Sequence, residues 1–321
     1  MSNPLVSVLI ITYNHEKYIR DAINGCLDQK SNFSYEIIIH DDASTDGTGE
    51  IVKEYAEKYP DLIIPIIQTE NQYSKGFKFI PEILVPMAKG KYIAFCEGDD
   101  YWCDPNKLQK QVEIMENDSS ISLCFTATKW IYEDGSKKNK VMRYFKKNHY
   151  LSSSEVILAG GGVTDIVSTV IRKDIFTFIP HWYNLSPVGD AAIYLLSLVK
   201  GVFFYLNDIT AVYRSGVRNS WTEKNKTSVE NEVNYKLKLI NMKDNFNKYT
   251  DGKFSSHIHK RINFDIIDLS FIYKDLRDFK TNFYPRLNFF EKIEYTIFKK
   301  FKSRLLWHKY RKLLRILGLI I

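Results

Sequence analysis

The chain has 321 residues, of which 45% are hydrophobic and 26% are charged, so it can bury a sizeable core and is not a disordered protein. Its formal net charge of +7 is concentrated at one end, because residues 291–321 hold nine of the 45 basic and two of the 38 acidic side chains. The remaining body has 36 of each sign, and a neutral body excludes a nucleic-acid-binding protein, which needs a basic face. The basic tail instead indicates contact with an anionic surface.

The cysteines and the first residues bear on the cellular compartment. Cys26, Cys96, Cys103 and Cys124 form no pair with the spacing of a zinc site or a redox motif, which predicts free thiols in a reducing compartment. The chain leads directly into the apolar run 6–11 without a basic stretch or a cleavage site, so we expect a core strand there rather than a signal peptide. No apolar run has the length of a membrane-spanning helix, and we expect a cytoplasmic protein.

The first half of the chain alternates between apolar runs typical of buried strands and amphipathic segments typical of helices. The strands are predicted at residues 5–11, 35–39, 62–67 and 91–96, and the helices at 19–27, 48–59, 77–88 and from 104 onwards. Pro81 and Pro86 should make the third helix irregular, and Asp104 and Pro105 should supply the N-cap and first position of the fourth. This alternation predicts a mostly parallel sheet, whose ligands bind at the carboxyl ends of the strands.

The second half is less regular. Strands are predicted at 121–128, 166–171 and 202–206, a hairpin turn at 133–136, and helices at 152–160 and 190–199. From about residue 222 the chain becomes polar and helical. The class is therefore α/β, with a helical extension at the C-terminal end.

Three predicted strands end in polar loops, at residues 12–15, 41–46 and 97–100, and the last two of these are acid-rich. Parallel strands would bring all three loops to one edge. Asp99 and Asp100 are adjacent carboxylates that repel each other unless a cation is present, and Mg²⁺ and Mn²⁺ prefer oxygen ligands. Such an ion, held by one or two carboxylates, keeps positions open for a substrate diphosphate. The alternative is an acidic turn that caps the next helix.

The other candidate residues each have a structural alternative. Asp41 and Asp42 can accept hydrogen bonds from a base or a ribose, or they can belong to a turn with an N-cap. The tripeptide 12–14 can flank a base, but a tripeptide alone is weak support. Asp190 opens a predicted helix, where the helix dipole by itself favours an acid.

Taken together, these loops resemble family 2 of the inverting glycosyltransferases, which have the GT-A fold. The matching stretches are Val6–Asn14, Glu36–Thr48 and Lys89–Trp102, with a looser match from Val188–Asp190 to Val212–Arg214. The resemblance covers about residues 6–221 and implies a Rossmann-like mixed sheet flanked by helices. Bacterial glycosyltransferases of cell-surface polysaccharides are the members that it suggests.

The resemblance also implies a division of the chain. We expect a GT-A domain over residues 1–221, with a nucleotide-sugar-binding half over 1–118 and an acceptor half over 119–221. Residues 222–321 would form the helical extension.

The resemblance assigns a role to each candidate residue. The nucleotide-sugar site would comprise Thr12, Tyr13, Asn14, Asp41, Asp42 and Asp99. Asp42 would pair with the base, supported by Asp41, and Asp99 would contact the ribose. Asp100 would bind the Mn²⁺ or Mg²⁺ that bridges the diphosphate, and Asp190 would be the general base. The donor would be a nucleotide-diphosphate sugar, by default a UDP-sugar, and the acceptor a hydroxyl of a glycan or of a lipid-linked sugar.

One departure from the family pattern concerns the diphosphate. Many relatives carry a His shortly after the Tyr-Arg pair, whereas here Tyr213 and Arg214 are followed by Ser-Gly-Val and Arg218. Arg214 or Arg218 is therefore a candidate for the diphosphate contact. The stretch 215–227 is either a mobile lid or an ordinary surface loop.

The last residues mix aromatic and basic side chains over 289–321 and close on the apolar run 316–321. A basic amphipathic helix of this kind suits a membrane interface, so we expect a peripheral protein on the cytoplasmic face, near a lipid-linked acceptor. The alternative is a helix that packs on its own domain or on a partner subunit of an oligomer.

Two other functions compete with glycosyl transfer. A sugar-phosphate nucleotidyltransferase should have a Gly-rich phosphate loop after the first strand, and residues 12–15 contain no Gly. A catalytically inactive, membrane-attached binding module would keep the fold without the activity. The presence of Asp42, Asp99, Asp100 and Asp190 argues against that module.

Overall fold

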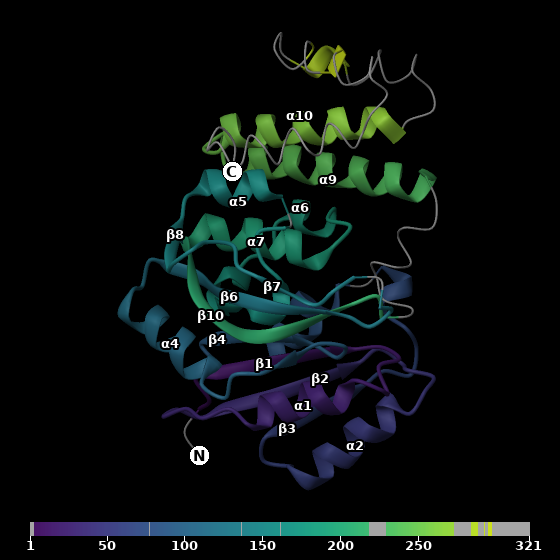
Figure 1. Cartoon of the computed structure of the whole chain (residues 1–321), viewed down its shortest axis with the longest axis vertical. Coiled ribbons are helices and arrows are strands. Elements are labelled where there is room, and N and C mark those ends of the chain that lie inside the picture. Colours follow the sequence, from purple (N-terminus) through teal and green to yellow (C-terminus); the bar gives the residue numbers. More distant parts are fainter. Residues whose placement is uncertain are drawn as a thin grey trace. The chain divides into compact units, whose positions relative to one another are not determined.

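The computed structural model describes residues 3–76, 78–135, 137–160, 162–217, 229–272, 284–287, 292, 295 and 296 (Figure 1). Its backbone contacts form two compact units. The first, here called the sheet unit, comprises Met1–Ser152, Gly161–Ile179 and Ala192–Arg218. The second, the helical unit, comprises Ser153–Gly160, Pro180–Ala191 and Asn219–Ile321. The expected domain boundaries at residues 118 and 221 stay predictions.

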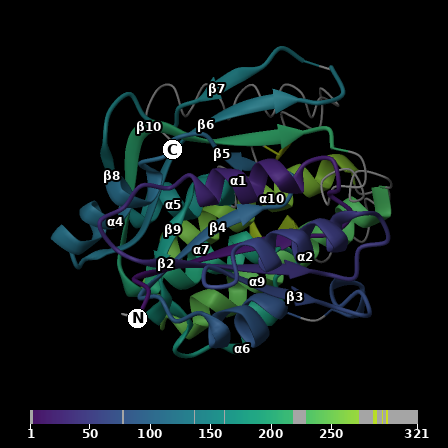
Figure 2. The ribbon, with the colours of Figure 1, turned by 90° about the horizontal axis from the view of Figure 1, so that it is seen from below.

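The sheet unit is built on one ten-stranded mixed sheet. Its strands are β1 (Val6–Thr12), β2 (Tyr35–Asp41), β3 (Ile63–Ile67), β4 (Tyr92–Glu97), β5 (Tyr101–Trp102), β6 (Ile121–Tyr132), β7 (Lys140–Met142), β8 (His149–Leu151), β9 (Val170–Arg172) and β10 (Val202–Ser215). The order is β3-β2-β1-β4-β9-β6-β10-β5, with β7 beside β6 and β8 beside β10. Figure 2 shows β7 beside β6. β1 to β4 are parallel as predicted, whereas β9 is antiparallel to both of its neighbours. This confirms the α/β class with a mixed sheet.

Helices α1 (Ile19–Leu27), α2 (Thr48–Lys58) and α4 (Lys107–Asn117) pack into one hydrophobic cluster with one face of the sheet. The apolar positions predicted for α1 are buried, since Ile19, Ala22, Ile23 and Cys26 all have 0% exposure. Burying an Ile side chain contributes about 2 kcal/mol, so this stripe fixes α1 on the sheet. The loop before α1 is thereby held next to the end of β1.

One predicted strand differs from the structure, and one predicted helix is irregular as expected. The predicted strand 166–171 is wrong in its first half, where Ile166–Ser168 form a 3₁₀ turn, and only β9 is extended. The turn forms because the carbonyl of Asp165 accepts the backbone N–H of Ser168 at 2.9 Å and its hydroxyl at 2.8 Å. The predicted irregularity of 77–88 is confirmed, since a π-helical turn (Ile80–Leu84) precedes the short α3 (Val85–Met87).

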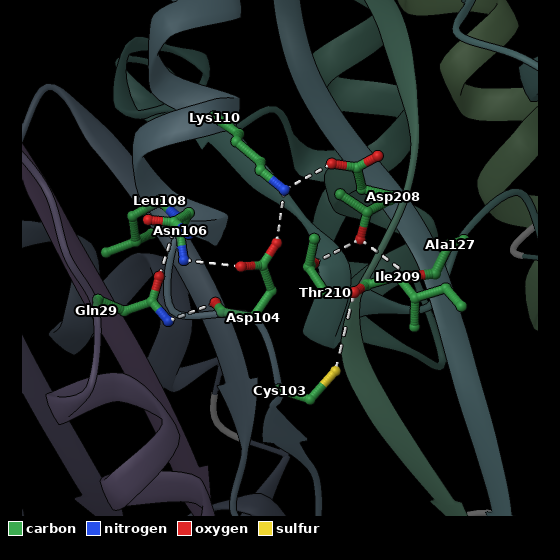
Figure 3. Close-up of polar contacts among 11 residues, drawn as sticks. Gln29, Cys103, Asp104, Asn106, Leu108, Lys110, Ala127, Asp208, Ile209 and Thr210 are labelled. Carbon is green, nitrogen blue, oxygen red and sulfur yellow. Dashed lines mark hydrogen bonds and ion pairs between the residues drawn. The ribbon is translucent and has the colours of Figure 1, made fainter.

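The predicted start of α4 is also wrong. The helix begins at Lys107 after the N-cap Asn106, and Asp104 lies in a turn before it (Figure 3). The Asp104 carboxylate accepts the Asn106 N–H and the Lys110 ammonium, both at 2.9 Å, so it closes the turn instead of capping the helix. Lys110 also reaches Asp208 at 2.7 Å, which ties α4 to β10.

The helical unit holds α5 (Ser153–Ala159), α6 (His181–Asn184), the first turn of α7 (Gly189–Lys200), α9 (Val229–Tyr249) and α10 (Ser255–Ile272). Figure 1 shows α9 and α10 side by side, and they pack against each other. None of the described helices is long and apolar enough to cross a membrane. The predicted tail 289–321 lies outside the described residues, apart from Lys292, Tyr295 and Thr296.

Candidate functional site

The sheet register places the loops 12–15, 41–46 and 97–100 at one edge. Thr12, the last residue of β1, pairs with Asp41 of β2, and Ile11 pairs with Glu97 of β4. The backbone N–H of Asp42 donates to the Thr12 carbonyl at 3.0 Å, which extends the pairing into the loops. Gly98 lies so close to the first loop that a Cβ there would be 2.5 Å from Thr12 Oγ1. The parallel order of β2, β1 and β4 therefore brings the predicted candidates of these loops together.

The first two loops hold each other through side chains. Asn14 has a left-handed backbone with φ of 58°. Its N–H donates to Ser44 Oγ at 2.8 Å, and its side-chain oxygen accepts the Thr45 N–H at 2.7 Å. Tyr13 beside it is half-buried. Hydrogen bonds thus join the loop that the sequence predicts for a nucleotide to the loop after β2.

Asp41 and Asp42 are buried, with exposures of 1% and 2%. Asp41 accepts the hydroxyl of Ser44, and burial raises the pKa of its carboxyl. Asp42 accepts the backbone N–H groups of Gln72 at 2.7 Å and Tyr73 at 3.0 Å, one on each oxygen. Each oxygen of a carboxylate can accept a second bond, so Asp42 can hold the 71–73 turn and still accept from a ligand. No pattern in the sequence predicted this turn.

Asp100 is the most unusual group at this edge. Its exposure is 1%, Oδ1 accepts the Arg214 N–H at 2.8 Å, and Oδ2 is buried without a hydrogen-bond partner among the described residues. Burial raises the pKa of Asp100 well above its usual value, and the neighbouring Asp99 and Glu97 add to the effect. A buried carboxylate oxygen without a partner costs free energy, and a bound cation would remove that cost.

Asp99 is less enclosed than Asp100. Its side chain is 16% exposed, and its Oδ2 lies 3.9 Å from Nε2 of His15. The hydroxyl of Thr12 is buried and, in the described part of the chain, unpartnered. Polar atoms with unused capacity therefore cluster where β1 and β4 end.

These residues fit a divalent cation that the protein holds with few ligands. Within the described ranges no group of three or more His, Cys, Asp and Glu residues could enclose a metal ion. The unpaired oxygen of Asp100, beside the carboxylate of Asp99, is instead suited to an ion that takes its remaining ligands from phosphates and water. Mg²⁺ and Mn²⁺ bind in this way more often than Ca²⁺ does.

Arg214 has more partners than the sequence suggested. Its guanidinium is buried and contacts the carboxylates of Asp21 and Glu133 as well as the Asp99 carbonyl. The rings of Tyr18 and Tyr101 lie 5.0 and 4.6 Å from its Cζ. Sequence reasoning missed these four side chains, because no local pattern connects them with the Tyr-Arg pair.

Asp190 belongs to the helical unit, in the first turn of α7. Its Oδ1 accepts the Ala191 N–H at 2.6 Å, and an acid in this first turn fits the helix-dipole alternative. Tyr183 and Tyr235 lie near enough for its charge to raise the pKa of both hydroxyls, although burial is the larger cause. Its role as a base stays a prediction. Arg218 and most of the predicted lid 215–227 lie outside the described residues.

Sequence comparisons identify relatives. A family model described as "Glycosyl transferase family 2" matches residues 7–169. An uncharacterised protein of Mycobacterium tuberculosis is 36% identical over 217 residues, or 67% of this chain, and this chain spans only 60% of its length. TuaG of Bacillus subtilis, provisionally named a teichuronic acid biosynthesis glycosyltransferase, is 32% identical over 70% of this chain and 86% of TuaG. WfaP of Escherichia coli, named a UDP-Glc:α-D-GlcNAc-diphosphoundecaprenol β-1,3-glucosyltransferase, is 30% identical over 59% of this chain and 72% of WfaP.

Solved structures with a similar fold include S. aureus TarS in complex with UDP-GlcNAc, with a TM-score of 0.58 and 17% identity over 90% of this chain and 79% of that one. The mannosyltransferase PcManGT from Pyrobaculum calidifontis, in complex with GDP-Man and Mn²⁺, has a TM-score of 0.56 and 13% identity over 97% of this chain and 84% of that one. At such identities the likeness concerns the fold alone, and the fold is GT-A. With the family match over half of its length, the chain belongs to glycosyl transferase family 2.

Proposed function

We propose that the protein transfers a sugar from a nucleotide-diphosphate sugar, by default a UDP-sugar, to a hydroxyl of a lipid-linked or growing surface glycan. The transfer is a metal-assisted single displacement that inverts the anomeric carbon. One observation carries this proposal: the buried Asp100 has a carboxylate oxygen with no hydrogen-bond partner in the part of the chain that the structure describes. This oxygen lies beside Asp99, at the edge where the acid-rich loops converge. A diphosphate with its cation supplies what that oxygen lacks.

The residues divide the work as follows. Thr12, Tyr13, Asn14, Asp41, Asp42 and Asp99 bind the nucleotide. Asp100 holds Mn²⁺ or Mg²⁺, which when bound neutralises charge on the departing diphosphate. Asp190 removes the proton of the acceptor hydroxyl as its oxygen attacks the anomeric carbon from the face opposite the diphosphate. The joined loops hold the donor in line for attack, which lowers the entropy cost of the step.

The names of relatives support the donor and acceptor classes. WfaP is named for transfer from UDP-Glc to a diphosphoundecaprenol-linked sugar, and TarS was solved with UDP-GlcNAc. PcManGT was solved with GDP-Man and Mn²⁺, which supports the metal and makes a guanine nucleotide the donor to test second. TuaG, by its provisional name, supports a place in surface polysaccharide synthesis.

A thermal-shift panel of nucleotide sugars, with and without Mn²⁺, tests the donor. We expect a stabilising shift with one nucleotide class that depends on the ion, and slow hydrolysis of that donor. Asp100→Asn should abolish the ion-dependent part of the shift. Glu36→Gln is the matched control, because Glu36 is also a buried carboxylate but lies at the amino end of β2, where it accepts from Ser7 and Lys89.

The outcomes of this panel separate the alternatives. Release of pyrophosphate from UTP and a sugar phosphate would favour a nucleotidyltransferase, and ion-dependent binding without hydrolysis or transfer would favour an inactive module. No nucleotide binding under any ion would refute the proposal.

We also propose that residues 289–321 attach the protein to the cytoplasmic face of an anionic membrane. Their basic and aromatic composition supports this placement. Full-length protein should float with anionic liposomes, and a chain that stops at Phe290 should not. Equal flotation of the two would remove the membrane role, and a change in size on gel filtration would point instead to a partner subunit.

A further inference from the structure

The side chain of Arg214 joins three separate parts of the sheet unit. Its NH1 donates to the carbonyl of Asp99 at 3.0 Å, its NH2 lies 2.5 Å from Asp21 Oδ2, and its Nε lies 3.3 Å from Glu133 Oε1. Asp21 belongs to α1, and Glu133 follows β6. The side chain is only 8% exposed, so these contacts are largely shielded from water.

The charges around Arg214 make it a poor partner for a diphosphate. Its single positive charge already faces the carboxylates of Asp21 and Glu133, and the rings of Tyr18 and Tyr101 lie within cation–π range. The planar guanidinium has five N–H donors in a fixed fork, and one on each nitrogen is engaged here. A phosphate that approached would have to compete with two carboxylates for this cation.

The same contacts make Arg214 well suited to hold the segment 97–102. Its backbone N–H fixes Oδ1 of Asp100 at 2.8 Å, so the orientation of the unpaired Oδ2 follows from the position of the Arg214 backbone. Its side chain fixes the main chain of Asp99 and the ring of Tyr101. The same helix α1 packs directly on β5, since a Cβ at Gly25 would lie 2.6 Å from the Trp102 carbonyl.

We infer that Arg214 is a positioning residue: it clamps the segment that carries Asp99 and Asp100 to α1 and to the end of β6, and it does not bind the diphosphate. The inference rests on the proposed function, because it concerns how that site is held. It leaves Arg218 as the predicted contact of the diphosphate.

Calorimetric titration of Arg214→Lys and Arg214→Met with UMP and with UDP, over a series of Mn²⁺ concentrations, separates the two roles. A positioning residue affects the ribose contact and the ion site together. We therefore expect UMP binding without Mn²⁺ to weaken about tenfold. The Mn²⁺ concentration for half-maximal UDP binding should also rise about tenfold. Both values correspond to a displacement of Asp99 and Asp100 by well under 1 Å. Arg214→Lys should not restore UMP binding or the Mn²⁺ requirement, because an ammonium cannot replace the forked N–H donors of the guanidinium.

Direct diphosphate contact predicts the opposite pattern and would overturn the inference. UMP binding and the Mn²⁺ requirement would then stay at wild-type values, UDP binding would weaken at every Mn²⁺ concentration, and Lys would restore much of it. Wild-type protein that binds neither nucleotide would refute the proposed function itself, so the two failures are distinguishable.

Two further variants test whether the loss of nucleotide binding reflects only a destabilised fold. Asp21→Asn removes one anchor at a residue whose side chain is 55% exposed, so it should fold and show the same pattern at smaller amplitude. Wild-type behaviour of Asp21→Asn would count against the clamp. Arg172→Lys is the matched control, because Arg172 also donates to backbone carbonyls and lies 5.4 Å from the Tyr92 ring. Arg172 pairs with the first residue of β4, whereas Asp99 and Asp100 follow the last. It should lose stability and keep both titrations unchanged.

Discussion

Two buried aspartates, one in each unit, have opposite surroundings. Asp265 of the helical unit is 3% exposed and accepts from Lys243 at 2.9 Å and Arg261 at 2.7 Å. Asp100 of the sheet unit is 1% exposed and accepts one backbone N–H. Burial alone would raise the pKa of both carboxyls, but the two cations hold that of Asp265 below its usual value, while that of Asp100 is raised. Among the described residues, the first carboxylate has cationic partners and the second has none.

This difference teaches how to separate structural from functional acids. A buried ion pair that is fully bonded within the fold needs nothing from outside. A buried carboxylate without a cation is unfavourable in the isolated protein, and such a site persists where a ligand completes it. Burial and residue type are the same in the two cases, so only the partners reveal the role.

The largest expected effect is on Asp265. Asp265→Asn leaves Lys243 and Arg261 without their counter-ion, and breaking a buried pair in this way costs about 3–5 kcal/mol of unfolding free energy. Urea unfolding followed by far-UV circular dichroism measures the loss. Asp244→Asn is the control, because the Asp244–Arg286 pair is 32% and 36% exposed and should contribute less than about 1 kcal/mol. Similar losses in the two variants would break the comparison.

Asp100→Asn should affect activity rather than stability, unlike Asp265→Asn. We expect donor hydrolysis or transfer to fall roughly 100-fold as the ion loses its ligand, whereas the unfolding free energy without metal should not fall. The pH dependence has a definite sign. Because the folded pKa of Asp100 is raised, its contribution to stability is present below the unfolded value near 4 and is lost as pH rises through the folded value. The variant should therefore lose less stability than wild type between pH 4 and 7, and a steeper loss would contradict this account.

Lys107 extends the comparison to a buried cation. It is 0% exposed, donates to Gln111 Oε1 at 2.7 Å and lies 4.5 Å from the Trp102 ring, and burial lowers its pKa to about 8. Below that pH the buried charge is unfavourable, and stability rises as pH increases from 8 towards 10.5.

Lys107→Met should therefore stabilise the protein by roughly 2 kcal/mol at pH 7, after the loss of the Gln111 bond. The gain should shrink to nothing near the unfolded pKa of about 10.4. Thermal unfolding at a series of pH values checks both points, and a gain that did not depend on pH would mean that packing rather than charge was responsible.

Much of the fold of residues 1–118 could be predicted from the sequence because its signals are local. The apolar stripe of α1 and the runs of β1, β2 and β4 each lie within a few residues, and parallel pairing then puts their ends at one edge. That reasoning needed no tertiary information. For this reason the sequence alone predicted that Asp42, Asp99 and Asp100 lie at the same edge of the sheet.

The rest depended on contacts that leave no local pattern. Arg214 and Asp21 are 193 residues apart, so the anchor of the acid-bearing segment could not be read from the sequence. The start of α4 was misplaced because Asp104 and Pro105 resemble an N-cap and a first helical residue, whereas Lys110 and Asn106 draw the Asp104 carboxylate into a turn. In both cases the contact is made by a long basic side chain, Arg214 or Lys110, whose partner cannot be inferred from the local sequence.

The smallest expected effect concerns a second acid pair near the site. Asp104 and Asp208 are bridged by Lys110, which is 39% exposed, so these two carboxylates already share a cation (Figure 3). Lys110→Met should cost about 0.5 kcal/mol, since partly exposed ion pairs contribute little and are screened by salt. Added Mn²⁺ should not restore the loss, because Asp208 is 43% exposed and water can satisfy it. Chemical unfolding with and without Mn²⁺ tests this, and recovery by the ion would mean that adjacent acids alone suffice for a metal site, without the burial that distinguishes Asp100.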